Sequence, residues 1–302
     1  ERWLRKAADQ GHGNAQYYLA KRYRDGNEPA RDIDEALRLM RLAAEQGLHL
    51  AQVDLAAMLV SGNGIPPDYA EAAMWYRRAA EQDSVEAQFM LGLLLDEGLG
   101  VRQDHEEASA WYAKAVERDH VDAQVRLGLM YAEGRGVQQD MNKAVKLLQD
   151  AAAMRHGGAN YNLAIMYAEG IGVPLDDEEA VRRLWRVRGP LQAEAQFYLG
   201  LMYDQGRGVP EDKAEARKWF RESARKGFAG AQFKLGSLYA EGLGVEENTP
   251  LAFVLFRLAA EQGHIEAETA MSTLAAGMTP EQATEAEKLA AEWARFQGKR
   301  PN

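Results

Sequence analysis

Three groups of residues in this chain have types and spacings that could do chemistry. Gly98 and Gly100 follow an apolar stretch and flank one residue, as in loops whose backbone amides hold a phosphate. Six histidines could bind a metal ion, and the acidic runs at 104–107 and 176–179 could bind calcium or act as paired catalytic carboxylates. The chain has no cysteine, which excludes disulfides, thiolate zinc sites and a cysteine nucleophile.

The glycine pair belongs to a repeat. The segment AQFMLG at residue 87 has counterparts AQYYLA at 15, AQVDLA at 51, AQVRLG at 123, ANYNLA at 159, AQFYLG at 195 and AQFKLG at 231. Every step is 36 residues, and a Gly-x-Gly loop follows most copies. A nucleotide site occurs once or twice in a chain, so the recurrence predicts an architectural loop.

The histidines and acidic runs also follow the repeat. Four histidines occupy one slot, three residues before a repeat begins: His12, His120, His156 and His264. Stacked repeats place such a slot about every 10 Å, whereas zinc–imidazole bonds are about 2 Å long, so we predict turn residues and no metal site. The acidic runs fall where a helix should begin, which predicts capping of backbone amides. No catalytic set and no cofactor site stand out, and we predict that the chain is not an enzyme.

Each 36-residue unit is predicted to form two helices joined by the glycine loop, because only glycine enters left-handed backbone regions without strain. Asp104 and Glu107 have the spacing of a capping box at the start of the second helix, and four other units carry the same pair. The predicted buried faces in 87–122 are Ala87, Leu91, Leu94 and Leu95 in the first helix and Ala108, Trp111, Tyr112 and Ala115 in the second.

One unit cannot bury its apolar face alone, so neighbouring units must stack. The predicted fold is therefore all-α: a right-handed α-α superhelix, or solenoid, of antiparallel helix pairs that forms one domain over 1–302. Residues 1–14 would be the second helix of a preceding repeat, and repeats begin at 15, 51, 87, 123, 159, 195 and 231. Residues 267–302 would be a degenerate capping repeat, in which Thr279 and Pro280 begin a helix. The first helices would line the concave surface.

The alternation Ala…Leu-Gly…Tyr…Gly-x-Gly-Val…Ala…Trp-Tyr…Ala-Ala…Gly, as in 195–227 and 231–263, resembles the Sel1-like repeat, a relative of the tetratricopeptide repeat. The resemblance covers nearly the whole chain. It implies a bacterial, exported or periplasmic adaptor or scaffold that binds a protein. It also implies two alternatives: an immunity protein that neutralises a secreted antibacterial toxin, such as a type VI secretion effector, or a scaffold in exopolysaccharide export, whose exposed aromatics would stack on polysaccharide.

Composition and charge limit the kinds of partner that the chain is expected to bind. The net charge is −10 and the chain has no basic stripe, which disfavours nucleic acid. No run of about 18 apolar residues is present, so no membrane span is predicted. The chain begins at Glu1 inside a helix-like pattern, and we expect any targeting segment to lie outside it. The predicted partner is a protein or peptide.

The candidate contact residues come from the third, seventh and tenth positions of the first helices, about one face away from the buried stripe. The candidates are Tyr17, Lys21, Arg24, Val60, Phe89, Leu93, Asp96, Val125, Leu129, Tyr161, Ile165, Phe197, Leu201, Asp204, Phe233 and Ser237. For the apolar third position two interpretations stay open, exposure in the groove or packing against the adjacent helix.

The segment VRRLWRVRGP at 181–190 breaks the repeat pattern. Arg183 stands where other units have leucine or tryptophan, Trp185 stands at the position of Arg41, Arg77 and Arg221, and Gly189-Pro190 should end the helix early. It predicts a contact patch of Arg182, Arg183, Trp185, Arg186 and Arg188; the alternative is neutral change absorbed by a small helix rotation. At 25–32, Glu28-Pro29 replaces the second glycine and valine, which predicts a loop of another shape.

Overall fold

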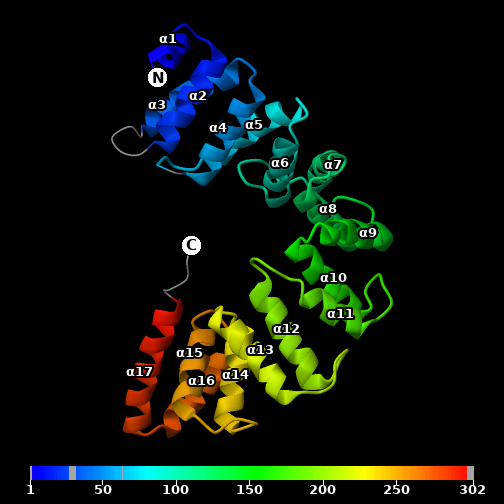
Figure 1. Ribbon diagram of the computed structural model, residues 1–302, viewed down its shortest axis with the longest axis vertical. Helices are drawn as coiled ribbons and strands as arrows, with labels where there is room; N and C mark the ends of the chain where they lie inside the picture. The colour runs from blue at the N-terminus through cyan, green and yellow to red at the C-terminus, as the bar shows by residue number, and fades with distance from the viewer. Residues whose placement is uncertain (1, 27–31, 63, 298–302) are drawn as a thin grey trace. The chain divides into compact units, whose positions relative to one another are not determined.

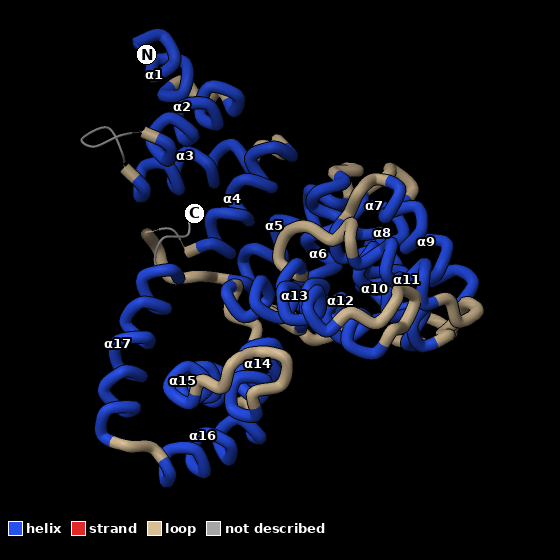
Figure 2. The backbone as a smooth tube through the Cα atoms, turned by 60° about the horizontal axis from the view of Figure 1, so that its bottom comes forward, coloured by secondary structure: helices blue, strands red, loops and turns tan. Residues whose placement is uncertain are grey.

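The computed structural model describes residues 2–26, 32–62 and 64–297. Of these residues 73% are helical, and no strand occurs among them (Figure 2). The prediction of an all-helical fold built from adjacent helix pairs is confirmed. The differently shaped loop predicted at Glu28 and Pro29 lies outside the described residues.

The chain forms two compact units, residues 1–151 and 152–302 (Figure 1). The helices up to the division are α1 (Arg2–Asp9), α2 (Gly13–Asp25), α3 (Ile33–Glu45), α4 (His49–Ser61), α5 (Tyr69–Ala80), α6 (Val85–Glu97), α7 (His105–Val116), α8 (Val121–Glu133) and α9 (Met141–Ala153). The later helices are α10 (Gly157–Glu169), α11 (Asp177–Leu184), α12 (Gln192–Gln205), α13 (Lys213–Arg225), α14 (Ala229–Glu241), α15 (Thr249–Ala260), α16 (Ile265–Gly277) and α17 (Pro280–Gln297).

The backbone repeats with the period of the sequence. The even-numbered helices from α2 to α16 are the first helices of the repeats, and the odd-numbered helices from α3 to α15 are the second helices. α4, α6, α8 and α10 begin at His49, Val85, Val121 and Gly157, each 36 residues after the one before. The second helices keep the same step, except that α11 ends early at Leu184.

The predicted apolar faces are buried. All eight residues named for 87–122 lie in the core, which each helix pair forms with its neighbours. The pair comes unusually close at Gly92 of α6, where an added Cβ would lie 2.6 Å from Cε1 of Tyr112 in α7. Glycine is needed there because a fully buried ring occupies the space that a methyl group would take.

The glycine loop holds neighbouring repeats together. Gly98 ends α6 in the left-handed conformation, and its N–H donates to the carbonyl of Leu94. A Cβ on Gly100 would lie 2.2 Å from the carbonyl carbon of Tyr69, the first residue of α5. The loop thus rests directly on the helix of the preceding repeat, and the second glycine serves packing between repeats.

Of the two hydrogen bonds in the predicted capping box, the structure contains the one accepted by the aspartate side chain and lacks the one accepted by the glutamate side chain. The Asp104 side chain accepts from the Glu107 N–H at 2.9 Å, and the N-cap aspartates of α3, α5, α11 and α13 accept in the same way. The Asp104 N–H, however, donates to the carbonyl of Leu95 at 3.0 Å. The Glu107 carboxylate therefore does not accept a hydrogen bond from the Asp104 N–H. That carboxylate is therefore available for contacts between repeats.

The C-terminal helix begins as predicted. Thr279 Oγ1 accepts from the Gln282 N–H at 3.3 Å, and the Thr279 N–H donates to Gln282 Oε1 at 2.9 Å, which is a reciprocal capping box. α17 lies alongside α15 (Figure 1). Trp293 of α17 packs against the cluster that contains Leu255.

Candidate functional site

The aromatic third positions pack against neighbouring helices. Phe89 stacks on His120, the residue before α8, with the ring centroids 4.5 Å apart. Phe233 stacks in the same way on His264, with the ring centroids 4.6 Å apart. Phe197 packs on the rings of Phe220 and Phe228, Tyr161 lies edge-on to Tyr198 at 6.0 Å, and Tyr17 and Val125 are buried. These side chains contribute mainly to the packing between repeats, and only part of each ring is accessible.

In the first compact unit, residues 1–151, the side chains of three predicted contact residues lie around the carboxylate of Asp54. The Tyr17 hydroxyl donates to Asp54 Oδ2 at 3.1 Å, and Arg24 Nη1 and Lys21 Nζ lie 3.5 and 3.9 Å from the same oxygen. Burial, followed by the negative charge of Asp54, raises the pKa of the Tyr17 phenol. Asp54 was not predicted from the sequence as a member of this cluster. The signal that could have indicated an acidic partner is the presence of Lys21 and Arg24 on one face of α2.

Asp96 is not an exposed groove residue, because only 3% of its surface is accessible. Its Oδ1 accepts from Arg135 Nη1 at 3.1 Å and lies 2.9 Å from His105 Nδ1. Both partners come from elements next to α6, so the carboxylate ties the start of α7 to the following loop. The remaining predicted residues of this stripe are half-buried: Val60, Leu93, Leu129, Ile165, Leu201 and Ser237.

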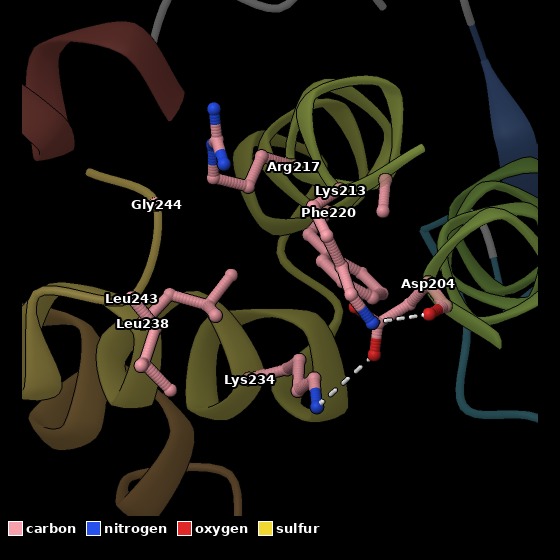
Figure 3. Close-up of a pocket in the computed structure, with 9 residues that line it drawn as sticks. Asp204, Lys213, Arg217, Phe220, Lys234, Leu238, Leu243 and Gly244 are labelled. Carbon is pink, nitrogen blue, oxygen red and sulfur yellow. Dashed lines mark hydrogen bonds and ion pairs between the residues drawn. The ribbon is translucent and has the colours of Figure 1, made fainter. Parts of the chain in front are cut away.

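Asp204, near the C-terminal end of α12, lies at a recess of about 360 Å³ in the second unit (Figure 3). Its carboxylate is held by two lysines, with Lys213 Nζ 3.2 Å from Oδ1 and Lys234 Nζ 3.6 Å from Oδ2. The other lining residues come from α13, α14 and the glycine loop: Ala216, Arg217, Phe220, Leu238, Leu243 and Gly244. The recess combines an apolar wall with a rim that carries three cations and one carboxylate.

The segment 181–190 presents Trp185 at the surface, with 44% of the residue accessible. Of the predicted arginines, two are committed to one carboxylate: Arg182 Nε and Arg183 Nε lie 2.7 and 2.6 Å from Glu179. Although burial opposes it, these hydrogen bonds lower the pKa of Glu179. Arg188 donates to the backbone carbonyls of Trp185 and Val187, and Arg186 is exposed.

In two repeats of the first compact unit, the slot of Trp185 carries an arginine that links repeats. Arg41 holds Glu71 through two hydrogen bonds of 3.0 and 2.8 Å, and Arg77 hydrogen-bonds to Glu107. The glutamate also accepts from a tryptophan one turn later, as Glu107 does from Trp111 Nε1 at 3.2 Å. Sequence reasoning missed these partners, which come from different repeats.

The histidines of the shared slot are the N-cap residues of α2, α8, α10 and α16. His120 Nδ1 and His156 Nδ1 accept from the N–H groups of Ala123 and Ala159 at 3.2 and 3.1 Å. Within the part of the chain that the structure describes, no three His, Cys, Asp or Glu side chains come together as metal ligands do. No helix in the same residues is long and apolar enough to cross a bilayer.

One protein-family model matches most of this chain. The model of the Sel1 repeat matches residues 1–12, 13–48, 49–84, 85–120, 121–156, 158–182, 193–228 and 229–264. The matched stretches leave out 183–192, the segment that carries Trp185. A comparison with curated proteins finds no match.

Two solved structures are similar over most of this chain. One is c5321, a protective antigen of uropathogenic Escherichia coli with an SLR fold (31% identity, TM-score 0.79, 100% of this chain). The other is a Sel1 repeat protein from Oxalobacter formigenes (33% identity, TM-score 0.78, 90% of this chain and 79% of its own length). The present chain spans only 64% of the length of c5321.

Proposed function

Because the chain belongs to the Sel1 repeat family, we infer that it is a non-enzymatic scaffold that holds a protein or peptide partner on the surface formed by its first helices. Sel1 repeat proteins are in general scaffolds for protein–protein interaction. The recess beside Asp204 is the observation that supports a binding role for this surface most directly. It is lined mainly by the second helix α13, together with Asp204 of the first helix α12, Lys234 and Leu238 of the first helix α14, and the glycine loop (Figure 3).

The chemistry of the recess suits a protein anchor. Phe220, Leu238 and Leu243 supply the apolar contact area that lets a partner side chain leave water. Arg217, Lys213 and Lys234 form a polar rim, as at protein interfaces in general. Since the ion pairs of Asp204 already hold both lysines, the site is formed before the partner arrives and little rearrangement is needed.

A photo-crosslinking residue at position 243 tests this proposal in the cells that produce the protein. Leu243 is 55% exposed at the recess, and Ile171 is 48% exposed in the same slot of another glycine loop, away from it. The expected result is a discrete crosslinked protein from position 243 and none from position 171. Equal products at both positions, or no product at position 243, would overturn the proposal.

The identity of the crosslinked protein separates more specific functions. The proposal places this scaffold in a bacterium, since both similar structures come from bacteria. Export to the periplasm stays a prediction. A secreted toxin as the crosslinked partner would make the scaffold an immunity protein. Binding of oligosaccharide without any crosslinked protein would replace the proposal with a role in polysaccharide export.

A further inference from the structure

A ladder of buried amides runs between repeats. Gln46, Gln82 and Gln262 each donate from Nε2 at 2.8 Å to the Oε1 of a glutamine 30 residues earlier, which is Gln16, Gln52 or Gln232. Each accepting glutamine in turn donates to the backbone carbonyl eight residues before it, as Gln52 does to Ala44 at 3.1 Å. Both ends of the buried amide are then satisfied, as burial requires.

Among the described residues the ladder is incomplete at Gln88, Gln124, Asn160 and Gln196, and Asn160 of α10 is the one slot where asparagine replaces glutamine. Its side chain is one methylene shorter, and Nδ2 turns back to the carbonyl of His156 at 3.0 Å. The residue 30 positions later is Pro190, whose side chain has no donor. Asn160 is 1% exposed and its Oδ1 has no hydrogen-bond partner among the described residues.

A cavity of about 520 Å³ borders Asn160, whose Oδ1 is itself shielded from solvent. It is formed by Asn160 with Ala152, Ala153, Arg155, Trp185, Arg186 and Arg188, and we refer to it as the Asn160 cavity. The second helix α11 ends at Leu184, four residues after the buried Ala180, whereas the other second helices continue for about one more turn. The early end places Trp185, Arg186 and Arg188 on the wall of the cavity.

The wall carries three positive charges and no acidic side chain. Arg188 Nη1 is held by the carbonyls of Trp185 and Val187, at 2.9 and 2.8 Å. In the described part of the chain, the structure shows no ion pair or hydrogen bond for the guanidinium groups of Arg155 and Arg186. Guanidinium groups bind carboxylates in a two-pronged geometry. The occupant must therefore bring an anion for the arginines.

We propose that the Asn160 cavity binds an acidic segment of a protein partner, with Asp or Glu carboxylates on Arg155 and Arg186. An acidic peptide carries several carboxylates along one chain, and the exposed face of Trp185 provides contact for its aliphatic carbons. The volume lies in the range of ligand sites, about 300–1,000 Å³. The proposal rests on the scaffold function and names the chemistry of its partner.

The test uses the whole chain and a peptide of alternating aspartate and glutamate that carries an uncharged dye, followed by fluorescence anisotropy. Arg155→Gln and Arg186→Gln are each expected to weaken binding by about tenfold, the value of one charge-assisted hydrogen bond. Arg182→Gln is the matched control, because it removes the same charge one turn away and Arg182 pairs with Glu179. It should leave binding unchanged, and the Asn/Gln version of the peptide should not bind.

Several outcomes would overturn the proposal. These are equal weakening by Arg182→Gln and Arg186→Gln, no binding of the acidic peptide, or displacement of the peptide by inorganic phosphate at a concentration equal to the peptide's Kd. The melting temperature of each variant shows whether the fold is kept, and these exposed arginines can change without opening the core. Loss of peptide binding with an intact crosslink at position 243 would reject this cavity alone, whereas loss of that crosslink would reject the scaffold function.

Discussion

The indole ring of Trp185 meets the ring of Trp219 edge-on, with the ring centroids 4.6 Å apart and the planes at 88°. Trp219 is half-buried in α13, and its Nε1 has no hydrogen-bond partner among the described residues. In the first unit the equivalent tryptophan donates to a glutamate, as Trp111 does to Glu107. Trp185 thus replaces an ion-pair link between repeats with an aromatic contact.

This contact predicts unequal effects of the two tryptophans on stability. Trp185→Ala should cost about 1 kcal/mol, because an exposed ring loses one edge-to-face contact. Trp219→Ala should cost about 3 kcal/mol, because it also leaves a cavity among the repeats. Urea denaturation measures both changes. Equal losses would show that Trp185 is a core residue rather than a surface one.

The ion pairs between repeats predict a loss of stability in acid. Hydrogen bonds from Arg41 and Arg77 are the main reason that the pKa values of Glu71 and Glu107 lie below the ordinary 4.5. Since these pKa values are lowered on folding, the stabilisation is present above about pH 4.5 and is lost as the pH falls through the folded values. Melting temperatures of Glu71→Gln and Glu107→Gln should therefore fall less steeply in acid than that of the unchanged chain.

Glu106→Gln is the control for this acid series, because Glu106 lies beside Glu107 without an arginine partner in the described structure. It should keep the full acid dependence. The ion-pair account is contradicted if Glu106→Gln flattens the profile as much as Glu107→Gln does.

Burial predicts a separate loss of stability in alkali. Burial raises the pKa of Tyr161 to about 12, with a contribution from Tyr198. The neutral phenol is favoured in the fold, so its stabilising contribution is complete below the ordinary pKa of about 10 and is lost as the pH rises toward 12. Tyr161→Phe should reduce the loss of melting temperature above pH 10. A Tyr161 phenolate that forms near pH 10, measured by difference absorbance against Tyr161→Phe, would refute the burial argument.

The amide ladder predicts a stabilising substitution. Gln88 Oε1 is buried without a partner among the described residues, and Arg118 stands 30 residues later, in the slot where three repeats have the donor glutamine. Arg118→Gln should stabilise the chain by about 1 kcal/mol by supplying the missing hydrogen bond. The opposite change, Gln82→Ala, should destabilise by a similar amount by removing the bond to Gln52. Denaturant midpoints measure both, and a neutral Arg118→Gln would contradict the ladder.

The helix pairs could be predicted from sequence because each depends on residues close together in the chain. The 36-residue step predicted the helices that begin at Val85 and Val121, and the buried face of 87–122 follows from helical spacing alone. The N-cap role of Asp104 is equally local. These features require no knowledge of how the repeats stack.

The partners of charged residues could not be predicted in the same way. Asp96 was expected at the surface, but it is buried. Its carboxylate contacts His105 at the start of α7 and Arg135 in the loop after α8. Glu107 was assigned to its own helix start, yet its partner Arg77 lies 30 residues earlier. Such pairs depend on the stacking of repeats, which periodicity does not define.

Two sequence changes mark the position of the Asn160 cavity, although no cavity was predicted from them. The glutamine slot changes to asparagine at 160, and the donor slot 30 residues later changes to proline. Either change alone is unremarkable among repeats that vary at most positions. Only the structure shows that both slots belong to one hydrogen-bond ladder, so that their joint loss leaves Asn160 Oδ1 unsatisfied.

The most direct test of the scaffold account is the affinity of the crosslinked partner, purified and titrated by calorimetry against two variants of this chain. Leu243→Asp places a charge at the apolar recess beside Asp204, and Ile171→Asp places the same charge in the equivalent loop slot away from it. The account predicts a Kd at least about tenfold higher for Leu243→Asp and an unchanged Kd for Ile171→Asp. Equal values for the two variants would contradict it.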